Sequence, residues 1–138
     1  MVLQPSVQKI NSFDSLYARD DSAKLLDDAG ARLIISAGVT WGQTRRLRQE
    51  AGIAVAHGLD YQRAITAITK TPAEVFGKGK ELGTLEKGKR ANLVLWSGDP
   101  LELSTMADAV WIDGDAMDLN TRQTELARRY LEKSAAQK

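Results

Sequence analysis

The chain has 138 residues, a formal net charge of +1 and 43% hydrophobic residues, which fits one ordinary folded domain. It has no cysteine and a single histidine, His57, which excludes disulfides, thiolate catalysis and zinc sites built from cysteine or from several histidines of one copy. The near-neutral charge argues against a dedicated nucleic-acid-binding protein, and no apolar run reaches the ~20 residues of a membrane span. The first residues lack a secretory signal, so a cytoplasmic location is the default expectation.

The first part of the chain predicts alternating strands and helices. Residues 2–3 are a short apolar segment, and a helix is expected from about residue 20 to Gly30, which suits the left-handed position that ends helices. The inward face of this helix consists of Leu25, Leu26 and Ala29. Residues 31–36 then form an apolar run typical of a buried strand. A helix joined through a tight glycine turn to such a strand is half of a β/α repeat.

Three consecutive helices are predicted between residues 43 and 77. The first, residues 43–57, ends at Gly58, and Asp60 caps the second. Residues 71–74, Thr-Pro-Ala-Glu, match a capping box with proline at the first helical position, so the third helix is expected to begin there and to end at Gly77. The inward residues are Leu47, Ala51, Ala54 and Val55 in the first helix and Ala64, Ile65 and Ile68 in the second.

The pattern changes to a β-rich one over residues 82–118. Residues 91–96 and 109–112 are apolar runs typical of strands, and Asp113-Gly114 suits a two-residue hairpin turn. The tryptophans of these two runs are interpreted as core residues; they are Trp96 and Trp111.

A last helix begins at Asn120 or Thr121 and is amphipathic. Its apolar side consists of Leu126, Tyr130 and Leu131, and charged residues occupy the rest of its surface. The chain shows no internal repeat and no low-complexity tract.

Residues of the kind that carry chemistry are few, and most have structural explanations. His57 has no Ser, Cys or acid pair at a catalytic spacing, so we interpret it as a helix-end residue. The stretch from Gly77 to Lys80 lacks the preceding strand and following helix of a phosphate loop and is interpreted as a solvated connector. Arg45, Arg46 and Arg48 form a basic run, but Arg45 and Arg46 point in different directions on a helix. With Glu50 and the near-neutral charge, the run indicates a solvated face rather than a nucleic-acid patch.

The loop after the strand at residues 31–36 is the candidate substrate pocket. Parallel β/α architectures place functional side chains at the carboxyl ends of strands and in the loops that follow. Ser36 and Thr40 are polar residues of this loop, and Trp41 is suited to form a pocket wall. No acid or histidine accompanies them, so the loop lacks a general base.

Four stretches, taken in chain order, carry a resemblance to a known family. They are residues 12–30, with Ser12-Phe13-Asp14 and Ala29-Gly30; residues 44–56, with Thr44-Arg45-Arg46-Leu47; residues 67–77, with Thr71-Pro72-Ala73-Glu74; and residues 82–102, with Leu82-Gly83-Thr84-Leu85-Glu86-Lys87-Gly88-Lys89 and Asn92-Leu93-Val94-Leu95-Trp96. This order resembles the C-terminal part of metal-dependent amidohydrolases, especially their imidazolonepropionase-like and dipeptidase-like branch. The most specific portion is the glycine-punctuated stretch from residue 82 to residue 100.

The resemblance implies an α/β fold: a partial (β/α) barrel with about the last two β/α units, the C-terminal part of the small amidohydrolase β-sandwich, and a terminal helix. On this basis residues 1–77 are assigned to the barrel units with their helical cluster, residues 78–120 to the β-sandwich segment and residues 121–138 to the terminal helix. Members of the family hydrolyse amide, cyclic amide or peptide C–N bonds with one or two divalent metals at the strand ends.

The sequence departs from the family at the expected metal site. The resemblance implies metal ligands on earlier barrel strands and one aspartate at the end of the last strand. The corresponding residues 36–39 are Ser-Ala-Gly-Val, which contain no carboxylate. We therefore expect no cofactor in this chain and assign it no catalytic or metal residue; the zinc or other divalent metal of the family needs ligands from other strands.

Functions of two classes follow. The chain is expected to be an amidohydrolase fragment that is not catalytic alone, or one subunit of a split amidohydrolase; the alternative is a non-enzymatic oligomerising or interaction module. Two barrel strands cannot close a barrel, so self-association or binding to a complementary barrel chain is predicted. The residues expected to drive it are Leu25, Leu26, Leu33, Ile35 and Ile65. No nucleic-acid or membrane partner is expected.

Overall fold

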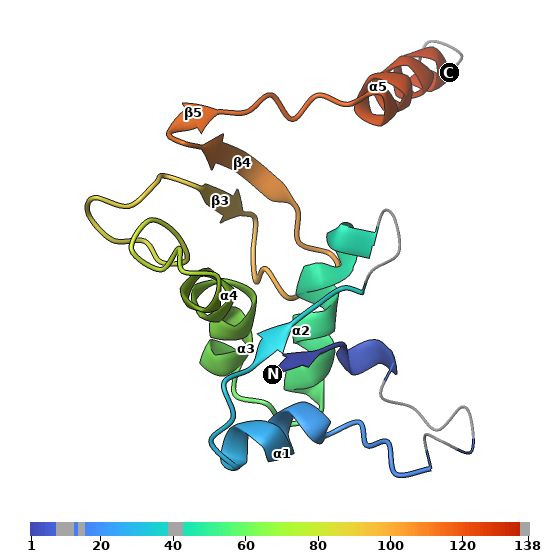
Figure 1. The fold of residues 1–138 in the computed structure, drawn as a ribbon. Helices are drawn as coiled ribbons and strands as arrows, with labels where there is room; N and C mark the ends of the chain where they lie inside the picture. The colour runs from blue at the N-terminus through green and yellow to red at the C-terminus, as the bar shows by residue number, and fades with distance from the viewer. Residues whose placement is uncertain (8–12, 14–15, 39–42, 136–138) are drawn as a thin grey trace.

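The computed structural model describes residues 1–7, 13, 16–38 and 43–135 (Figure 1). In its N-terminal unit, β1 (Val2–Leu3) and β2 (Ile34–Ile35) pair in parallel, and α1 (Ser22–Asp28) lies between them in the chain. Gly30 has a φ of 80°, which favours glycine and lets the chain turn from α1 toward β2. The predicted order of helix, glycine turn and buried strand is confirmed here.

The buried face of α1 differs from the prediction. Ala23 is buried and Leu26 packs partly against the core, whereas Leu25 is 44% exposed and Ala29 is an exposed C-cap residue. Ala23 and Leu26 stand three positions apart and share one face, while Leu25 projects about 100° away from Leu26 around the helix axis. The predicted placement of Leu25 and Ala29 on the inward face is therefore wrong.

A cluster of helices follows β2, as predicted. The 3-10 helix η3 (Gln43–Arg46) leads into α2 (Leu47–Ala56), and α3 (Tyr61–Ile68) and α4 (Lys70–Val75) come next. At the start of α3 the Asp60 carboxylate accepts a hydrogen bond of 3.0 Å from the Arg63 amide, which confirms Asp60 as a cap.

The predicted start of α4 is wrong. The helix begins at Lys70 with Thr69 at the N-cap, and Thr71 is buried within the first turn instead of capping it. Pro72 is accommodated because the first amide groups of a helix have no acceptor within that helix. Thr71, three positions before Glu74, therefore does not mark the start of α4.

Replacing Asp60 with alanine is expected to lower the free energy of unfolding by about 1 kcal/mol, since the Arg63 amide loses its acceptor. Asp21 is the control, because it occupies the N-cap position of α1 without a capping hydrogen bond among the described residues, and its carboxylate pairs with Arg19 at the surface, where ion pairs contribute little. Urea denaturation of Asp60→Ala and Asp21→Ala checks this; an equal or larger loss for Asp21→Ala contradicts the capping role of Asp60.

The core lies between the β1–β2 pair and the helices α2 and α3. Two alanines of α2 and two of α3 are enclosed, and their small side chains allow the two helices to pack closely; they are Ala51, Ala54, Ala64 and Ala67. The buried cluster consists of Leu3, Ala23, Leu33, Ile35, Ala51, Ala54, Leu59, Ala64 and Ala67. Leu47, Val55 and Ile68 pack against this cluster as partly buried residues.

An antiparallel sheet forms the second unit. β3 (Leu93–Trp96), β4 (Ala107–Ile112) and β5 (Asp115–Ala116) pair in the order β3-β4-β5. Asp113 and Gly114 have φ angles of 53° and 93°, so the predicted two-residue hairpin turn is confirmed. Trp96 and Trp111 are half-buried rather than enclosed, because within the described part of the chain no second sheet packs on this one.

The terminal helix α5 (Arg122–Ala135) begins close to the predicted residue. The amide of Thr124 donates to the Thr121 hydroxyl at 3.2 Å, which places Thr121 at the cap. In Figure 1, α5 lies beyond the sheet at the end of an extended segment and apart from the other helices. Within the described ranges, the helices are too short or too polar to span a bilayer.

Candidate functional site

The carboxyl ends of β1 and β2 open at the same edge, because the two strands are parallel. The segments that follow them are Gln4 to Ser6 and Ser36 to Gly38. The Ser36 amide donates to the Leu3 carbonyl at 2.8 Å, and the half-buried Ser36 hydroxyl accepts from the Gly38 amide at 3.2 Å. The structure therefore places Ser36 at a strand end, where β/α folds carry functional groups.

The Gln4 side chain lies against the backbone of Gly38. A Cβ atom on Gly38 would lie 2.8 Å from Gln4 Oε1, and the φ of Gly38 is 88°. The backbone conformation favours glycine here, whereas the amide end of the Gln4 side chain could move aside for a Cβ atom. Gln4 is not among the predicted site residues, although its position directly after an apolar segment is a signal that could have identified it.

Glu50 is completely buried, although the sequence predicts a solvated face around it. Its Oε2 accepts from the Ser6 amide at 2.8 Å and its Oε1 accepts from the Ser6 hydroxyl at 2.6 Å. Arg46 Nη2 lies 3.9 Å from Oε1. Glu50 shares the inward face of α2 with Ala51 and Ala54, so the carboxylate anchors the segment after β1, including the 3-10 helix η1 (Pro5–Val7), on α2.

The prediction of a solvated face is also wrong for Arg48. Its guanidinium lies 4.9 Å from the Trp96 ring centroid and donates to the carbonyls of Pro100 at 3.2 Å and Glu102 at 3.1 Å. It thus links α2 to the strand end of β3 and to the segment that follows. Arg45, by contrast, is exposed as predicted.

The other charged candidates have local partners. His57 Nδ1 lies 2.9 Å from the Ile53 carbonyl oxygen, at the C-cap of α2, which agrees with its interpretation as a helix-end residue. Lys78 follows α4 rather than a strand and pairs with Glu81 at 3.0 Å. This hydrogen bond holds the pKa of Glu81 below its usual value.

The three predicted pocket residues are only partly placed by the structure. Ser36 lies at the strand-end edge with Gln4, while Thr40 and Trp41 fall outside the described residues. Across the described ranges, no three His, Cys, Asp or Glu side chains are grouped to hold a metal ion. The polar groups at this edge are a hydroxyl and an amide, and Glu50 is engaged by Ser6, so these residues do not fit a zinc site by themselves.

Comparison with known proteins gives consistent matches. The model of the amidohydrolase family matches residues 25–117, which is more than half of the chain. Amidohydrolase tasK of Hapsidospora irregularis is 33% identical over 95 residues, which are 69% of this chain and 10% of that protein. The chain therefore spans about a tenth of the length of this curated relative.

Two crystal structures show a similar fold. An amidohydrolase from Thermotoga maritima MSB8 superposes with a TM-score of 0.76 at 22% identity, covering 85% of this chain and 30% of that one. A second structure described as an amidohydrolase has a TM-score of 0.63 at 23% identity, and the match covers 78% of this chain and 28% of that one. With the family match over residues 25–117, the motifs and the fold agree, and the chain belongs to the amidohydrolase family.

Proposed function

We propose that this chain supplies the C-terminal part of a metal-dependent amidohydrolase of the imidazolonepropionase-like and dipeptidase-like branch, which hydrolyses amide, cyclic amide or peptide C–N bonds. The observation that carries the proposal is the parallel β1–β2 pair. Within the described residues no strand pairs with either outer edge, whereas a closed β/α barrel has about eight strands. The similarity to 30% of the Thermotoga maritima amidohydrolase supports the same division.

In this proposal the chain holds two strand ends in place, and other barrel strands supply the metal ligands and the general base. Glu50 fixes Ser6 on α2, and Gln4 packs on Gly38 across the pair. These contacts set the relative positions of the two segments that border a substrate at this edge. The chain alone is then inactive, and it acts either as part of a longer polypeptide or as one subunit of a split enzyme.

A chimera tests the proposal. In the Thermotoga maritima amidohydrolase, the segment similar to this chain is replaced by residues 1–117, and zinc-dependent hydrolysis of dipeptides and N-acyl amino acids is measured. Because residues 36–39 carry no carboxylate where the resemblance implies an aspartate, we expect the chimera to hydrolyse a substrate of the unmodified enzyme more slowly than that enzyme does, and the enzyme lacking the segment to be inactive. A chimera that folds by circular dichroism but is no more active than the enzyme lacking the segment contradicts the proposal.

The isolated chain provides the complementary measurement. With added Zn²⁺ we expect no turnover of the same substrates, because the described side chains do not form a metal site. Metal-dependent turnover by the isolated chain contradicts the assignment of the chemistry to other strands.

A second candidate function is a non-enzymatic interaction module, and the open β3–β5 sheet favours it. Val94, Leu95 and Ile112 of this sheet are exposed. The prediction that Leu33 and Ile35 drive association is wrong, because both are buried in the chain's own core and are not available to a partner. Light scattering of the isolated chain tests this function, and a stable monomer at micromolar concentration contradicts it.

A further inference from the structure

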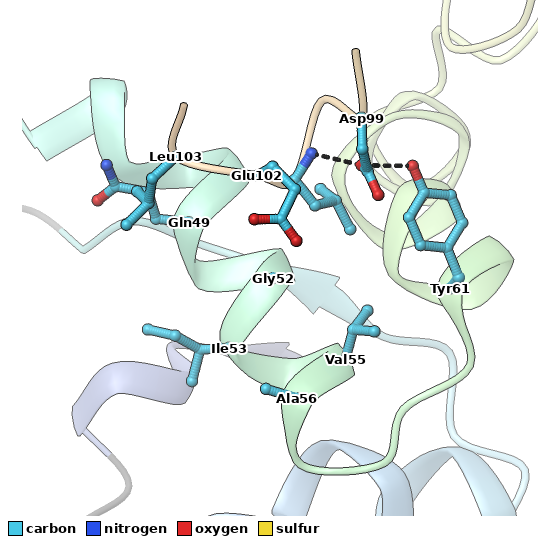
Figure 2. Close-up of a pocket in the computed structure, with 10 residues that line it drawn as sticks. Gln49, Gly52, Ile53, Val55, Ala56, Tyr61, Asp99, Glu102 and Leu103 are labelled. Carbon is cyan, nitrogen blue, oxygen red and sulfur yellow. Dashed lines mark hydrogen bonds between the residues drawn. The ribbon is translucent and has the colours of Figure 1, made fainter. Parts of the chain in front are cut away.

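An open groove runs between α2 and the segment of residues 99–103, and Figure 2 shows the side chains that line it. Its volume is about 450 Å³. Ile53 and Ala56 of α2 and Leu101 and Leu103 of the facing segment make most of the surface apolar. The hollow has room for a few large side chains rather than for a whole helix.

The groove lies on the side of α2 opposite the core. Four groove residues of α2, at positions 49, 52, 53 and 56, are spaced by three or four and share one face, and Val55 lies at its border with the core. The buried residues at positions 50, 51 and 54 form the opposite face. At Gly52 a Cβ atom would lie 3.0 Å from the Leu101 carbonyl oxygen, so this glycine lets the facing segment approach α2 closely. Strands added to β1 or β2 therefore leave the groove uncovered.

Two carboxylates give the groove a negative rim. Asp99 Oδ1 accepts hydrogen bonds of 2.8 Å from the Tyr61 hydroxyl and the Leu101 amide, and the Glu102 side chain extends over the outer face of α2 in Figure 2. Neither carboxylate forms an ion pair with a described residue. The nearby Arg48 contacts the Glu102 carbonyl and stacks over Trp96. Partial desolvation, together with the bond to Asp99 and its charge, raises the pKa of Tyr61.

α5 carries a face that is complementary to this groove. Leu126 and Tyr130 are 36% and 66% exposed, and every side chain from Arg122 to Tyr130 is exposed. The spacing of residues 122, 126, 129 and 130 places Arg122, Leu126, Arg129 and Tyr130 on one face, so two arginines flank two apolar side chains. Three arginines and Glu125 give residues 122–130 a net charge of +2.

We propose that the Arg122/Leu126/Arg129/Tyr130 face of α5 docks in the groove of a second copy of this chain. In Figure 1, α5 lies beyond the β3–β5 sheet and apart from α2, which forms one wall of the groove, so a second copy is the occupant that this arrangement favours. A reciprocal exchange gives a two-fold dimer with two identical contacts. In each contact the apolar pair fills the hollow, and the arginines approach Asp99 and Glu102. This inference does not depend on the proposed function.

A charge exchange between copies tests the contact. Arg129→Glu and Glu102→Lys each place like charges in both contacts of a homodimer, so each is expected to raise the dimer dissociation constant by at least about tenfold in sedimentation experiments. In an equimolar mixture of the two variants, the α5 face with the new glutamate meets the groove with the new lysine, and the unmodified face meets the unmodified groove. We therefore expect the mixture, and the double variant Arg129→Glu/Glu102→Lys, to regain dimerisation.

Arg128→Glu is the matched control, because it makes the same charge change on the opposite side of α5 and should leave the dimer unchanged. Circular dichroism of each variant checks that the helix content of the chain is unchanged. A monomeric unmodified chain at all accessible concentrations overturns the proposal, as does a dimer insensitive to Arg129→Glu. Association through the open strand edges would survive all of these variants, which distinguishes it from docking of α5.

Discussion

Replacing Glu50 with alanine is expected to lower the free energy of unfolding by about 3 kcal/mol, with a fall in Tm of roughly 10 °C. The carboxylate is completely buried and accepts hydrogen bonds from both the amide and the hydroxyl of Ser6. Alanine leaves these donors without their acceptor and leaves a void between α2 and η1. Thermal and urea denaturation followed by circular dichroism measure the effect.

Two further variants separate the causes of this loss. Glu50→Gln keeps the shape and one acceptor oxygen, so a loss of about 1 kcal/mol is expected. Glu74→Ala is the surface control, because the Glu74 side chain is 40% exposed and its pairing with Arg32 at the surface contributes less than about 1 kcal/mol. If Glu50→Ala is no more destabilising than Glu74→Ala, the anchoring role of Glu50 is wrong.

Gly83→Ala is the second substitution with a large expected effect, a loss of about 3 kcal/mol. Gly83 has a φ of 96°, and a Cβ atom there would lie 2.7 Å from Ala73 Cβ, 3.0 Å from Lys70 Cα and 3.1 Å from the Thr69 carbonyl oxygen. Two of these atoms belong to the backbone of the α4 region and cannot move aside as a flexible side chain can. The substitution combines backbone strain with a steric clash, and urea denaturation measures the total.

Gly88→Ala provides a matched control five residues further along the same glycine-rich stretch. Its φ is 90°, close to that of Gly83, but among the described residues nothing lies within 4 Å of the Cβ position. We expect a loss of about 1 kcal/mol from backbone strain alone. The difference between the two variants then measures the close packing of the 82–89 turn on α4. Equal losses contradict that packing.

These contacts explain how a short chain joins two units of structure. Arg48 connects α2 to the segment after β3, and Gly83 seats the intervening turns on α4. Through these contacts, helices α2 to α4 connect the β1–β2 pair to the β3–β5 sheet. A partner that adds strands to β1 and β2 would meet a surface whose position relative to the second sheet is already set.

The strand-end position of Ser36 could be predicted from the sequence, whereas the contacts around it could not. Ser36 is identified because a polar residue follows a buried apolar run, which is a local pattern. The contact of Gln4 with Gly38 could not be predicted from the sequence, because Gly38 lies 34 positions further along the chain. Glu50 is misassigned from the sequence because its partner is Ser6, 44 positions away.

The sequence by itself determined the elements whose causes lie within a few residues. The Asp113-Gly114 turn, the Asp60 cap and the glycine turn at Gly30 depend on local backbone geometry, and the amidohydrolase motifs are read from the residues directly. Only the tertiary structure decided which charges are buried and which apolar residues stay exposed, as Glu50 and Leu25 show. The physical reason is that burial depends on which distant segment covers a helix face, and periodicity within the helix does not contain that information.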